Sequence, residues 1–284
     1  MLASLEGLDH VVVMVKELDS AAERWRALGF TLSPRGTHSA QMGSGNYTIL
    51  FQDDYVELLG ILHETPHNAP SREFLQRRGE GIERAAFTTS NAIEGIEALR
   101  ALGIEAAGPV EFSRPVDLPD GKKTEAAFSI FTWPTSERPG DLRIFACQHH
   151  TRQAVWVPSL QTHANTANRI VRVEVIARQP QQAAQQLARL IDGEATAQEG
   201  GAMRVATAPG RGEFVFLSAD AFAARHPGAD RPTLPQEGVA ALVLGVGDLD
   251  AAARATGGRV EAGSREFAVP ADRANGVMLV FQKA

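Results

Sequence analysis

The sequence predicts an α+β protein built from four βαβββ units, and three observations support this prediction. The segment Arg26–Phe30 recurs 74 residues later as Arg100–Ile104. Four apolar, strand-like runs divide the chain, and each leads into a segment with helical spacing of its apolar residues. The segment Asp248–Ala252 also echoes Glu17–Ala21. Because a single unit would leave one face of its sheet uncovered, we expect the units to pair.

The first two units occupy the N-terminal half of the chain. The opening strand, Leu8–Val15, is rich in valine and bounded by polar residues, which is typical of a β-strand. Asp19–Leu28 follows with apolar residues at helical spacing and stops at Gly29. Further strands of these two units are predicted at His38–Gly43, Tyr47–Gln52, Tyr55–Leu62, Ile82–Thr88, Glu125–Thr132 and Leu142–Gln148. The polar segment Glu64–Gly81, which contains two prolines, is predicted to connect the units.

The third and fourth units occupy the C-terminal half. The third begins with the strand Ile170–Ala177 and the helix Gln181–Ile191, and the fourth begins with the strand Val239–Leu244. Their later strands are predicted at Ala202–Thr207, Gly212–Leu217, Arg265–Val269 and Gly276–Gln282. The proline-rich segment Ala219–Glu237 is predicted to join the two units. We therefore expect a first domain at residues 1–155, a linker at 156–168 and a second domain at 169–284.

Composition and charge exclude several classes of protein. The net charge of −6 gives no electrostatic basis for binding nucleic acid or an anionic membrane. No apolar run approaches the roughly 20 residues that span a bilayer. With one cysteine, Cys147, and no secretory signal, the sequence predicts a cytoplasmic protein without an intrachain disulfide. Nucleotide-binding glycine motifs are missing, and Gly43–Gly45 is a hairpin turn and not a nucleophile elbow.

His10 lies near the entrance of the first strand and is a candidate metal ligand. The 74-residue offset aligns it with Arg84, and matching the helices that follow aligns it with Arg172 and Ala241. Arginine stays protonated and cannot ligate a metal, and alanine offers no ligand atom. Of the four first strands, only the first has a metal-capable side chain at this position.

Two strands and one later segment resemble a known family. The first strand reads Leu8–Val13, and the last strand of the first unit reads Tyr55–Gly60. With the paired βαβββ units, these strands resemble the vicinal oxygen chelate superfamily, which contains glyoxalase I, extradiol dioxygenases and bleomycin-resistance proteins. The narrower likeness is to two-domain bacterial glyoxalase-like domain proteins, and it includes Gln148–Thr151, Trp156, Pro158 and His163–Asn165. The close likeness covers about residues 7–175, and only the βαβββ pattern is similar beyond them.

The resemblance implies two half-open β-barrels, each made of two units, with helices outside and a divalent metal inside a barrel. In this superfamily the ligands come from the first and last strands of each unit, which implies His10 and Glu57 here. An imidazole and a carboxylate suit Zn, Ni, Mn, Fe or Co. The last strand of the second unit lacks a glutamate, so His149 at its end is the candidate for a third ligand.

Five further residues are candidates for substrate binding: Arg84, Arg114, His38, Asn46 and Tyr55. The two guanidinium groups could grip a carboxylate or an enolate oxygen through two parallel hydrogen bonds. The histidine and the asparagine flank the turn at the mouth of the cup, and the tyrosine shares a strand face with Glu57. An alternative role for Arg84 is an ion pair with Glu57 that replaces the metal.

Two classes of function remain open. His10 and Glu57 favour a metal-dependent isomerase, lyase or dioxygenase that acts on a small, oxygen-rich substrate with vicinal carbonyl and hydroxyl groups or a carboxylate. Arg84 favours a metal-free protein that binds or sequesters a small molecule, as in the bleomycin-resistance branch. The second half, with Arg172 and Ala241 at the aligned positions, is predicted to be degenerate and to close the pocket or form a homodimer surface. No nucleic-acid or membrane partner is expected.

Overall fold

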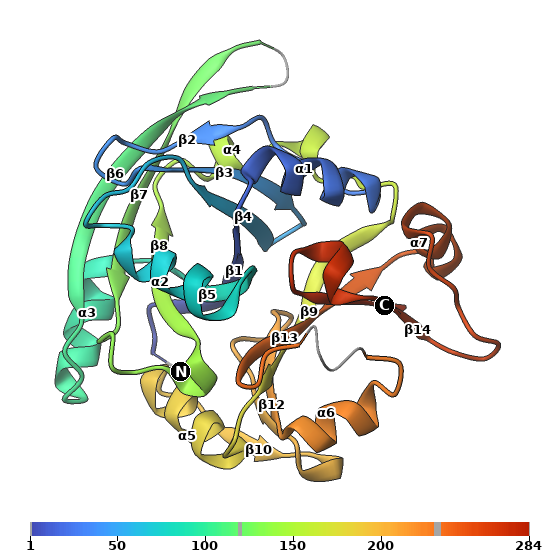
Figure 1. The fold of residues 1–284 in the computed structure, drawn as a ribbon. Helices are drawn as coiled ribbons and strands as arrows, with labels where there is room; N and C mark the ends of the chain where they lie inside the picture. Colours follow the sequence, from blue (N-terminus) through green and yellow to red (C-terminus); the bar gives the residue numbers. More distant parts are fainter. Residues whose placement is uncertain (1, 119–120, 230–233, 284) are drawn as a thin grey trace.

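The computed structural model describes residues 2–118, 121–229 and 234–283 and has two mixed β-sheets with helices packed around them (Figure 1). The first sheet has eight strands, and the second has seven. This arrangement of sheets and helices is the vicinal oxygen chelate fold that the sequence predicts. None of the helices in these ranges is long and apolar enough to cross a membrane.

The first sheet is formed by the first two units in the order β2-β3-β4-β1-β5-β8-β7-β6. Its strands are β1 (Leu5–Val15), β2 (Gly36–Thr37), β3 (Ser44–Leu50), β4 (Tyr55–Ile61), β5 (Gly81–Thr89), β6 (Ala107–Asp117), β7 (Lys123–Thr132) and β8 (Arg143–His149). The helices of this half are α1 (Leu18–Ala27), α2 (Ala69–Arg78), α3 (Ala92–Ala101) and α4 (Arg152–Val155), with 3-10 turns η1 (Pro139–Asp141) and η2 (Pro158–Leu160).

The second sheet is formed by the third and fourth units in the order β10-β11-β12-β9-β13-β15-β14. Its strands are β9 (Ala167–Ile176), β10 (Ala195–Ala197), β11 (Met203–Val205), β12 (Glu213–Leu217), β13 (Gly238–Val246), β14 (Glu266–Val269) and β15 (Met278–Lys283). The helices are α5 (Pro180–Leu190), α6 (Ala219–Arg225) and α7 (Leu249–Thr256), with 3-10 turns η3 (Glu199–Gly201) and η5 (Ala271–Ala274).

The units pair in sequence order, a point that the sequence left open. Strand β1 lies antiparallel to β5, and β9 lies antiparallel to β13. In the first sheet this pairing sets Val12 opposite Arg84 and His10 opposite Ala86. The first strands of units one and two therefore face the same cup.

A β-bulge interrupts each of the four first strands at the same place. The extra residues are Asp9 in β1, Glu83 in β5, Val171 in β9 and Ala240 in β13, each one before the residue aligned from sequence. A bulge bends the strand and re-aims side chains, so it can turn two consecutive residues toward one face. The alignment of His10 with Arg84, Arg172 and Ala241 thus coincides with a repeated structural feature.

Several predicted connections and strands are wrong in detail. Helix α2 lies inside the predicted connection 64–81, because Pro70 sits in the first turn of the helix, where a missing N–H costs nothing. Helix α6 begins within 219–237, and the Ser218 side chain caps it. Residues 38–43 form a loop and not a strand, since the chain reverses through Gly43 at φ +63°.

The number of strands in each unit also differs from the predicted pattern. Strand β6 was missed because it is exposed along most of its length and shows no hydrophobic alternation. The short β10 was missed as well. Within the described residues, the fourth unit has only two strands after its helix, β14 and β15, so its pattern is βαββ.

One continuous core joins the outer faces of the two sheets. It contains large side chains from both halves, among them Trp25, Phe87, Phe214 and Phe281. Phe87 and Phe214 lie 6.0 Å apart between ring centroids, and the Trp25 indole donates to Asn275 at 3.1 Å. Burial of each such side chain contributes about 1.5–3 kcal/mol. The halves are therefore packed together and leave their inner faces for other roles.

The two inner faces are filled differently. Phe222 of α6 is buried against apolar residues of the second sheet, including Val215 and Val243. Helix α2 occupies the corresponding place in the first half, where Phe74 packs against Val12. Beyond Phe74 the first inner face stays open and forms a cup, whereas α6 fills the second.

Candidate functional site

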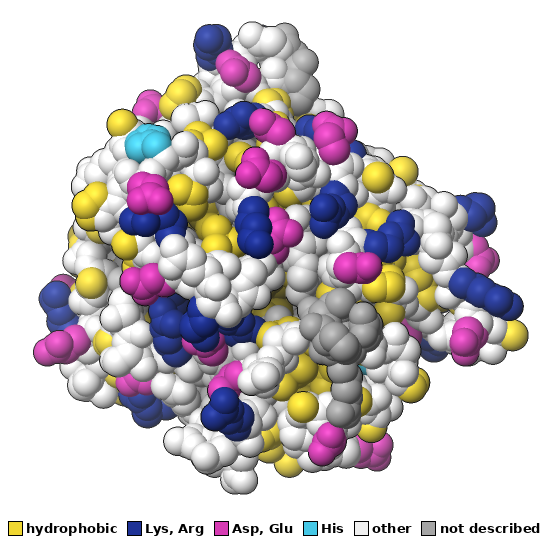
Figure 2. Space-filling model, viewed as in Figure 1, with side chains coloured by type: hydrophobic (Ala, Val, Ile, Leu, Met, Phe, Trp, Pro, Cys, Tyr) yellow, Lys and Arg dark blue, Asp and Glu magenta, His cyan; other side chains and the backbone are white. Residues whose placement is uncertain are grey.

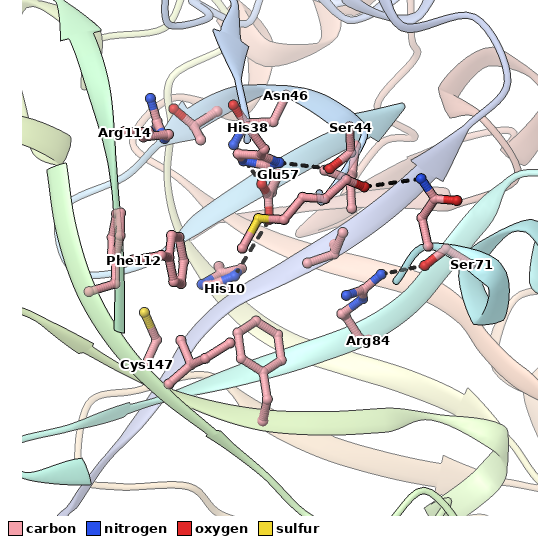
Figure 3. A pocket seen from close by; sticks show the side chains of 18 of the residues that line it. His10, His38, Ser44, Asn46, Glu57, Ser71, Arg84, Phe112, Arg114 and Cys147 are labelled. Carbon is pink, nitrogen blue, oxygen red and sulfur yellow. Dashed lines mark hydrogen bonds and ion pairs between the residues drawn. The ribbon is translucent and has the colours of Figure 1, made fainter. Parts of the chain in front are cut away.

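The cup of the first sheet is a cavity of about 190 Å³ (Figure 3). Seven residues named from sequence line it: His10, His38, Asn46, Tyr55, Glu57, Arg84 and Arg114. They come from β1, β3, β4, β5, β6 and the loop before β3. His149 does not line this cavity and lies beside Asp9.

His10 is held rigidly at the base of the cup and is 2% exposed. Its Nδ1 lies 2.6 Å from Oδ2 of Asp9, the bulge residue before it. Tyr55 stacks on the imidazole at 4.2 Å between ring centroids, and Phe145 meets it edge-on at 5.4 Å. Asp9 is placed to hold a proton on Nδ1, and this orientation turns Nε2 toward the cavity.

Glu57 faces this nitrogen from β4. Its Oε2 lies 3.7 Å from His10 Nε2, which is too long for a hydrogen bond. Its other oxygen, Oε1, accepts a hydrogen bond from the Asn46 amide at 2.6 Å. Two lone-pair groups that face each other in a buried site call for a positive charge between them, either a cation or a proton on His10.

Asp9 is the buried acceptor on which this arrangement depends. Besides His10, it accepts from His149 Nε2 at 3.1 Å and from the Thr88 hydroxyl at 2.7 Å. Burial alone would raise the pKa of Asp9, but His149 and His10 hold that pKa far below its usual range. The carboxylate therefore stays ionised with no contact to solvent.

Arg84 is held in the same way by the bulge residue of β5. Its Nε donates to Glu83 at 2.6 Å, and one Nη donates to Ser71 of α2 at 2.6 Å. Arg143 of β8 donates to the other oxygen of Glu83 at 2.5 Å. The alternative of an Arg84–Glu57 ion pair is thus wrong, because Glu83 is the carboxylate that binds Arg84. Among the described residues no hydrogen bond is made by Nη1 of Arg84, and this group could bind an anion in the cup.

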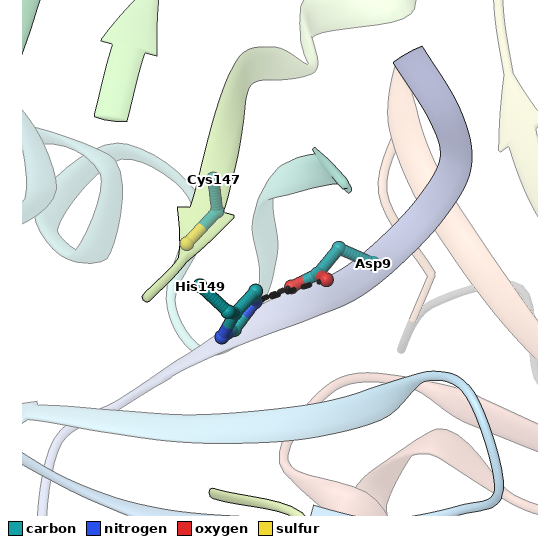
Figure 4. A group of neighbouring side chains, drawn as sticks. All are labelled: Asp9, Cys147 and His149. Carbon is teal, nitrogen blue, oxygen red and sulfur yellow. Dashed lines mark hydrogen bonds and ion pairs between the residues drawn. The ribbon is translucent and has the colours of Figure 1, made fainter. Parts of the chain in front are cut away.

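His149 belongs to a separate buried cluster with Asp9 and Cys147 (Figure 4). One ligand atom of each lies within 4.8 Å of the others. Burial raises the pKa of the Cys147 thiol well above its usual value, and the charge of Asp9 raises it further. The thiol is therefore protonated, and Asp9 is already engaged with His10. The hydrogen bond from His149 fixes Asp9, which in turn fixes His10.

Some residues at the mouth of the cup were predicted from the sequence, and others were not. His38 lies 2.8 Å from the Ser44 hydroxyl, and burial lowers its pKa although Glu57 opposes this shift. His67 and Ser71 also line the cavity. They were missed because helix α2 was hidden in a segment interpreted as a connection. Phe145, on β8, was not reached by the 74-residue offset, which would align Glu57 with Phe131, because the second unit has more residues before its last strand.

The register identifies four equivalent positions around the cup. Glu57 lies opposite Val12, two residues beyond His10, and Phe145 lies opposite Ala86, two residues beyond Arg84. The first unit thus offers an imidazole and a carboxylate, while the second offers a guanidinium and a phenyl ring. The first pair fits a divalent ion by its donor types, and the second pair has no metal ligand.

The sequence of residues 8–191 matches the Glyoxalase-like domain family, and the chain belongs to that family. Its fold is that of the vicinal oxygen chelate superfamily. Among proteins with curated function, none matches the chain in sequence.

Solved structures show the same fold at low sequence identity. A hypothetical protein from Staphylococcus aureus is 12% identical, with a TM-score of 0.71, over 98% of this chain and 99% of that one. A triple mutant of 4-hydroxymandelate synthase from Streptomyces coelicolor is 13% identical, with a TM-score of 0.56, over 99% and 93%. A fusion of a xylose isomerase-like TIM barrel with 4-hydroxyphenylpyruvate dioxygenase is 14% identical, with a TM-score of 0.56, over 96% of this chain and 41% of that chain.

Proposed function

We propose that this protein is a divalent-metal-dependent enzyme that acts on a small, oxygen-rich anion bound in the cup. The observation that carries the proposal is the 3.7 Å approach of His10 Nε2 to Glu57 Oε2, with Asp9 bonded to the opposite ring nitrogen. A carboxylate behind a histidine is the usual support of a metal-ligating imidazole. Ligand bonds of about 2.1 Å from each atom are compatible with this separation.

The residues of the cup divide the work of binding and orientation. Asp9 keeps the proton on Nδ1 of His10, and Asn46 holds one oxygen of Glu57 so that the other faces the cavity. Arg84 and Arg114 supply positive charge for a carboxylate or an enolate oxygen of the substrate. A divalent ion, when bound, supplies a Lewis acid for vicinal oxygens.

The apolar wall of the cup limits access of water. Phe112 of β6 and Phe128 of β7 stack at 5.1 Å between ring centroids, and both line the cavity. Low local polarity strengthens the attraction between the arginines and an anionic substrate. The proposed substrate class is a small carboxylate with an adjacent carbonyl or hydroxyl group.

A second candidate is a metal-free protein that binds the same class of small molecule. It is favoured by Arg84 and Phe145, which occupy the second pair of ligand-equivalent positions. In this case a protonated His10 would compensate Glu57, and Arg84 would bind the ligand directly. The homodimer and the cytoplasmic location stay predictions from the sequence.

Metal content separates the two candidates. Wild type, His10→Ala and Glu57→Ala are purified without chelator, dialysed against Zn, Ni, Mn, Fe or Co, and measured by inductively coupled plasma mass spectrometry. His63→Ala, at an exposed histidine of the loop after β4, is the matched control. We expect bound metal in wild type and in the control, and affinity at least about tenfold lower in the two cup variants. Equal metal content in all four proteins would refute the metal-dependent proposal.

A further inference from the structure

A second groove, outside the cup, lies where the two halves of the molecule meet. It has a volume of about 670 Å³ and is bordered by the end of α2, by η1, by Arg178 after β9 and by the segment before β13. Figure 2 shows Lys and Arg side chains gathered closely around acidic ones on this face. The proposed function does not use this groove.

Three arginines share one carboxylate in the groove. Arg77 and Arg78, at the end of α2, each donate to Oδ2 of Asp141 at 2.9 Å. Arg138 donates to Oδ1 of the same residue at 3.4 Å. Arg178, across the groove, lies 3.6 Å from Glu237. One carboxylate therefore balances one of three converging guanidinium groups, and two positive charges remain uncompensated by it.

The centre of this cluster is packed into the fold, and Arg77 and Arg138 approach it from the surface. The Arg78 side chain is only 11% exposed, and Asp141 is 18% exposed. Guanidinium groups stay protonated when buried, so Arg78 keeps its charge. Their mutual repulsion is stronger here than in open solvent. A bound anion would relieve it.

The backbone makes room for this cluster. Gly238, the first residue of β13, has φ +120°, and a Cβ there would lie 2.2 Å from Nη1 of Arg78. Gly140 has φ +60°, and a Cβ there would lie 2.5 Å from Val175 of β9. Gly140 thus lets the Asp141 loop pack against Val175, and a Cβ at Gly238 would displace the Arg78 guanidinium group from its place.

We infer that this groove binds the dianionic phosphate group of a small phosphorylated ligand. Arginine forks match phosphate oxygens through paired hydrogen bonds, and two negative charges match the surplus around Asp141. A carboxylate ligand would bring only one charge. The exposed heads of Arg77 and Arg138 have N–H groups left to donate, because each makes one contact with Asp141. The groove is large enough for an organic body attached to the phosphate.

Calorimetric titration of the full chain tests this inference, with chloride used to hold the ionic strength constant. The probes are inorganic phosphate, glycerol phosphate and adenosine monophosphate, which distinguish the free anion from a phosphate ester. The double variant Arg77→Ala, Arg138→Ala should bind the phosphate group roughly tenfold more weakly or worse. Arg254→Ala, at an exposed arginine on α7 away from the groove, is the control and should bind as wild type does.

A third variant should change the affinity for phosphate in the opposite direction. Asp141→Asn removes the competing charge, and asparagine tolerates the positive φ of 60° at this position. It should bind the phosphate group roughly tenfold more tightly than wild type. Tighter binding could not follow from a merely damaged fold. Absence of saturable binding by wild type, or unchanged affinity in the double variant and in Asp141→Asn, would overturn the inference. His10→Ala should bind normally, so the outcome is independent of the cup.

Discussion

Asp9→Asn is the substitution with the sharpest expected effect on this protein. The carboxylate has no exposed surface and accepts from His10, His149 and Thr88. An amide has one acceptor and one donor group, so its NH2 must face at least one ring N–H that now donates to Asp9. The change therefore replaces attraction with repulsion inside the sheet while keeping nearly the same shape.

The magnitude follows from the bonds that are lost. Two bonds from imidazole N–H groups to a buried carboxylate contribute about 1.5–3 kcal/mol each. Loss of a partner from such a buried network predicts a decrease of about 3–5 kcal/mol in the free energy of unfolding. Because the pKa of Asp9 is lowered on folding, this contribution is present above the unfolded pKa near 4 and disappears as the pH falls. Metal affinity should fall about 10–100-fold when the support of His10 is lost.

Urea unfolding at pH 7, followed by circular dichroism, measures the stability term, and equilibrium dialysis measures metal binding. Asp250→Asn, at an exposed aspartate in the first turn of α7, is the control for the change from carboxylate to amide and should unfold close to the wild-type urea concentration. If Asp9→Asn unfolds at the wild-type urea concentration, the histidines do not depend on this carboxylate. The proposed support of His10 by Asp9 would then be refuted.

Two further predictions concern the buried carboxylate of Asp54 and the two proposed metal ligands of the cup, which both come from the first unit. Burial raises the pKa of Asp54 to about 7 from 3.8, so its penalty is absent at low pH and grows as the pH rises through this window. In urea titrations, Asp54→Asn should therefore be more stable than wild type at pH 8, by up to about 4 kcal/mol, and little different at pH 4; equal stability at pH 8 would contradict the shift. The double variant Arg84→His, Phe145→Glu places metal ligands at all four equivalent positions and should raise metal affinity at least about tenfold in equilibrium dialysis. Unchanged affinity would mean that the four side chains do not converge on one point.

The repeat and the first strands could be predicted because their signals are local. Apart from Asp9 and His10, Leu8–Val15 is apolar, and both faces of this strand are buried in the structure. The offset between Arg26–Phe30 and Arg100–Ile104 carries over directly to His10 and Arg84, because each follows a bulge at the same place in its strand. The alignment of the repeats thus matched two residues that each follow a bulge, although the sequence did not predict the bulges themselves.

The elements that escaped prediction lack such signals. Strand β6 is exposed almost throughout. It is held at the sheet edge by hydrogen bonds to β7, which a pattern of apolar residues does not predict. Helix α2 has a weak apolar stripe with only Ser71 and Phe74 buried, so its polar sequence resembles a loop. The sequence also did not predict that Arg84 bonds to Ser71 and pairs with Glu83. Both depend on how distant elements pack.

Buried carboxylates hold side chains in place on both inner faces, but with different partners. In the first sheet, Asp9 and Glu83 sit at the bulges and hold His10 and Arg84 at the wall, so these two side chains border an open space. In the second sheet the bulge residues are apolar, and the buried acid is Glu174 of β9.

Glu174 contacts residues at the end of α6 on the inner face, in addition to Arg172 of its own strand. Its Oε2 lies 2.6 Å from Nε2 of His226, the residue after α6, and Arg225 of that helix donates to Oε1 at 3.3 Å. Burial would raise the pKa of Glu174, but His226 and Arg172 lower it to about 2, so the carboxylate stays ionised. This charge holds α6 in place with Phe222 against the sheet. The helix therefore makes the difference: α6 brings Phe222 and the partners of Glu174 onto the second sheet, whereas Ser71 of α2 bonds to Glu83 and leaves the cup open beside it.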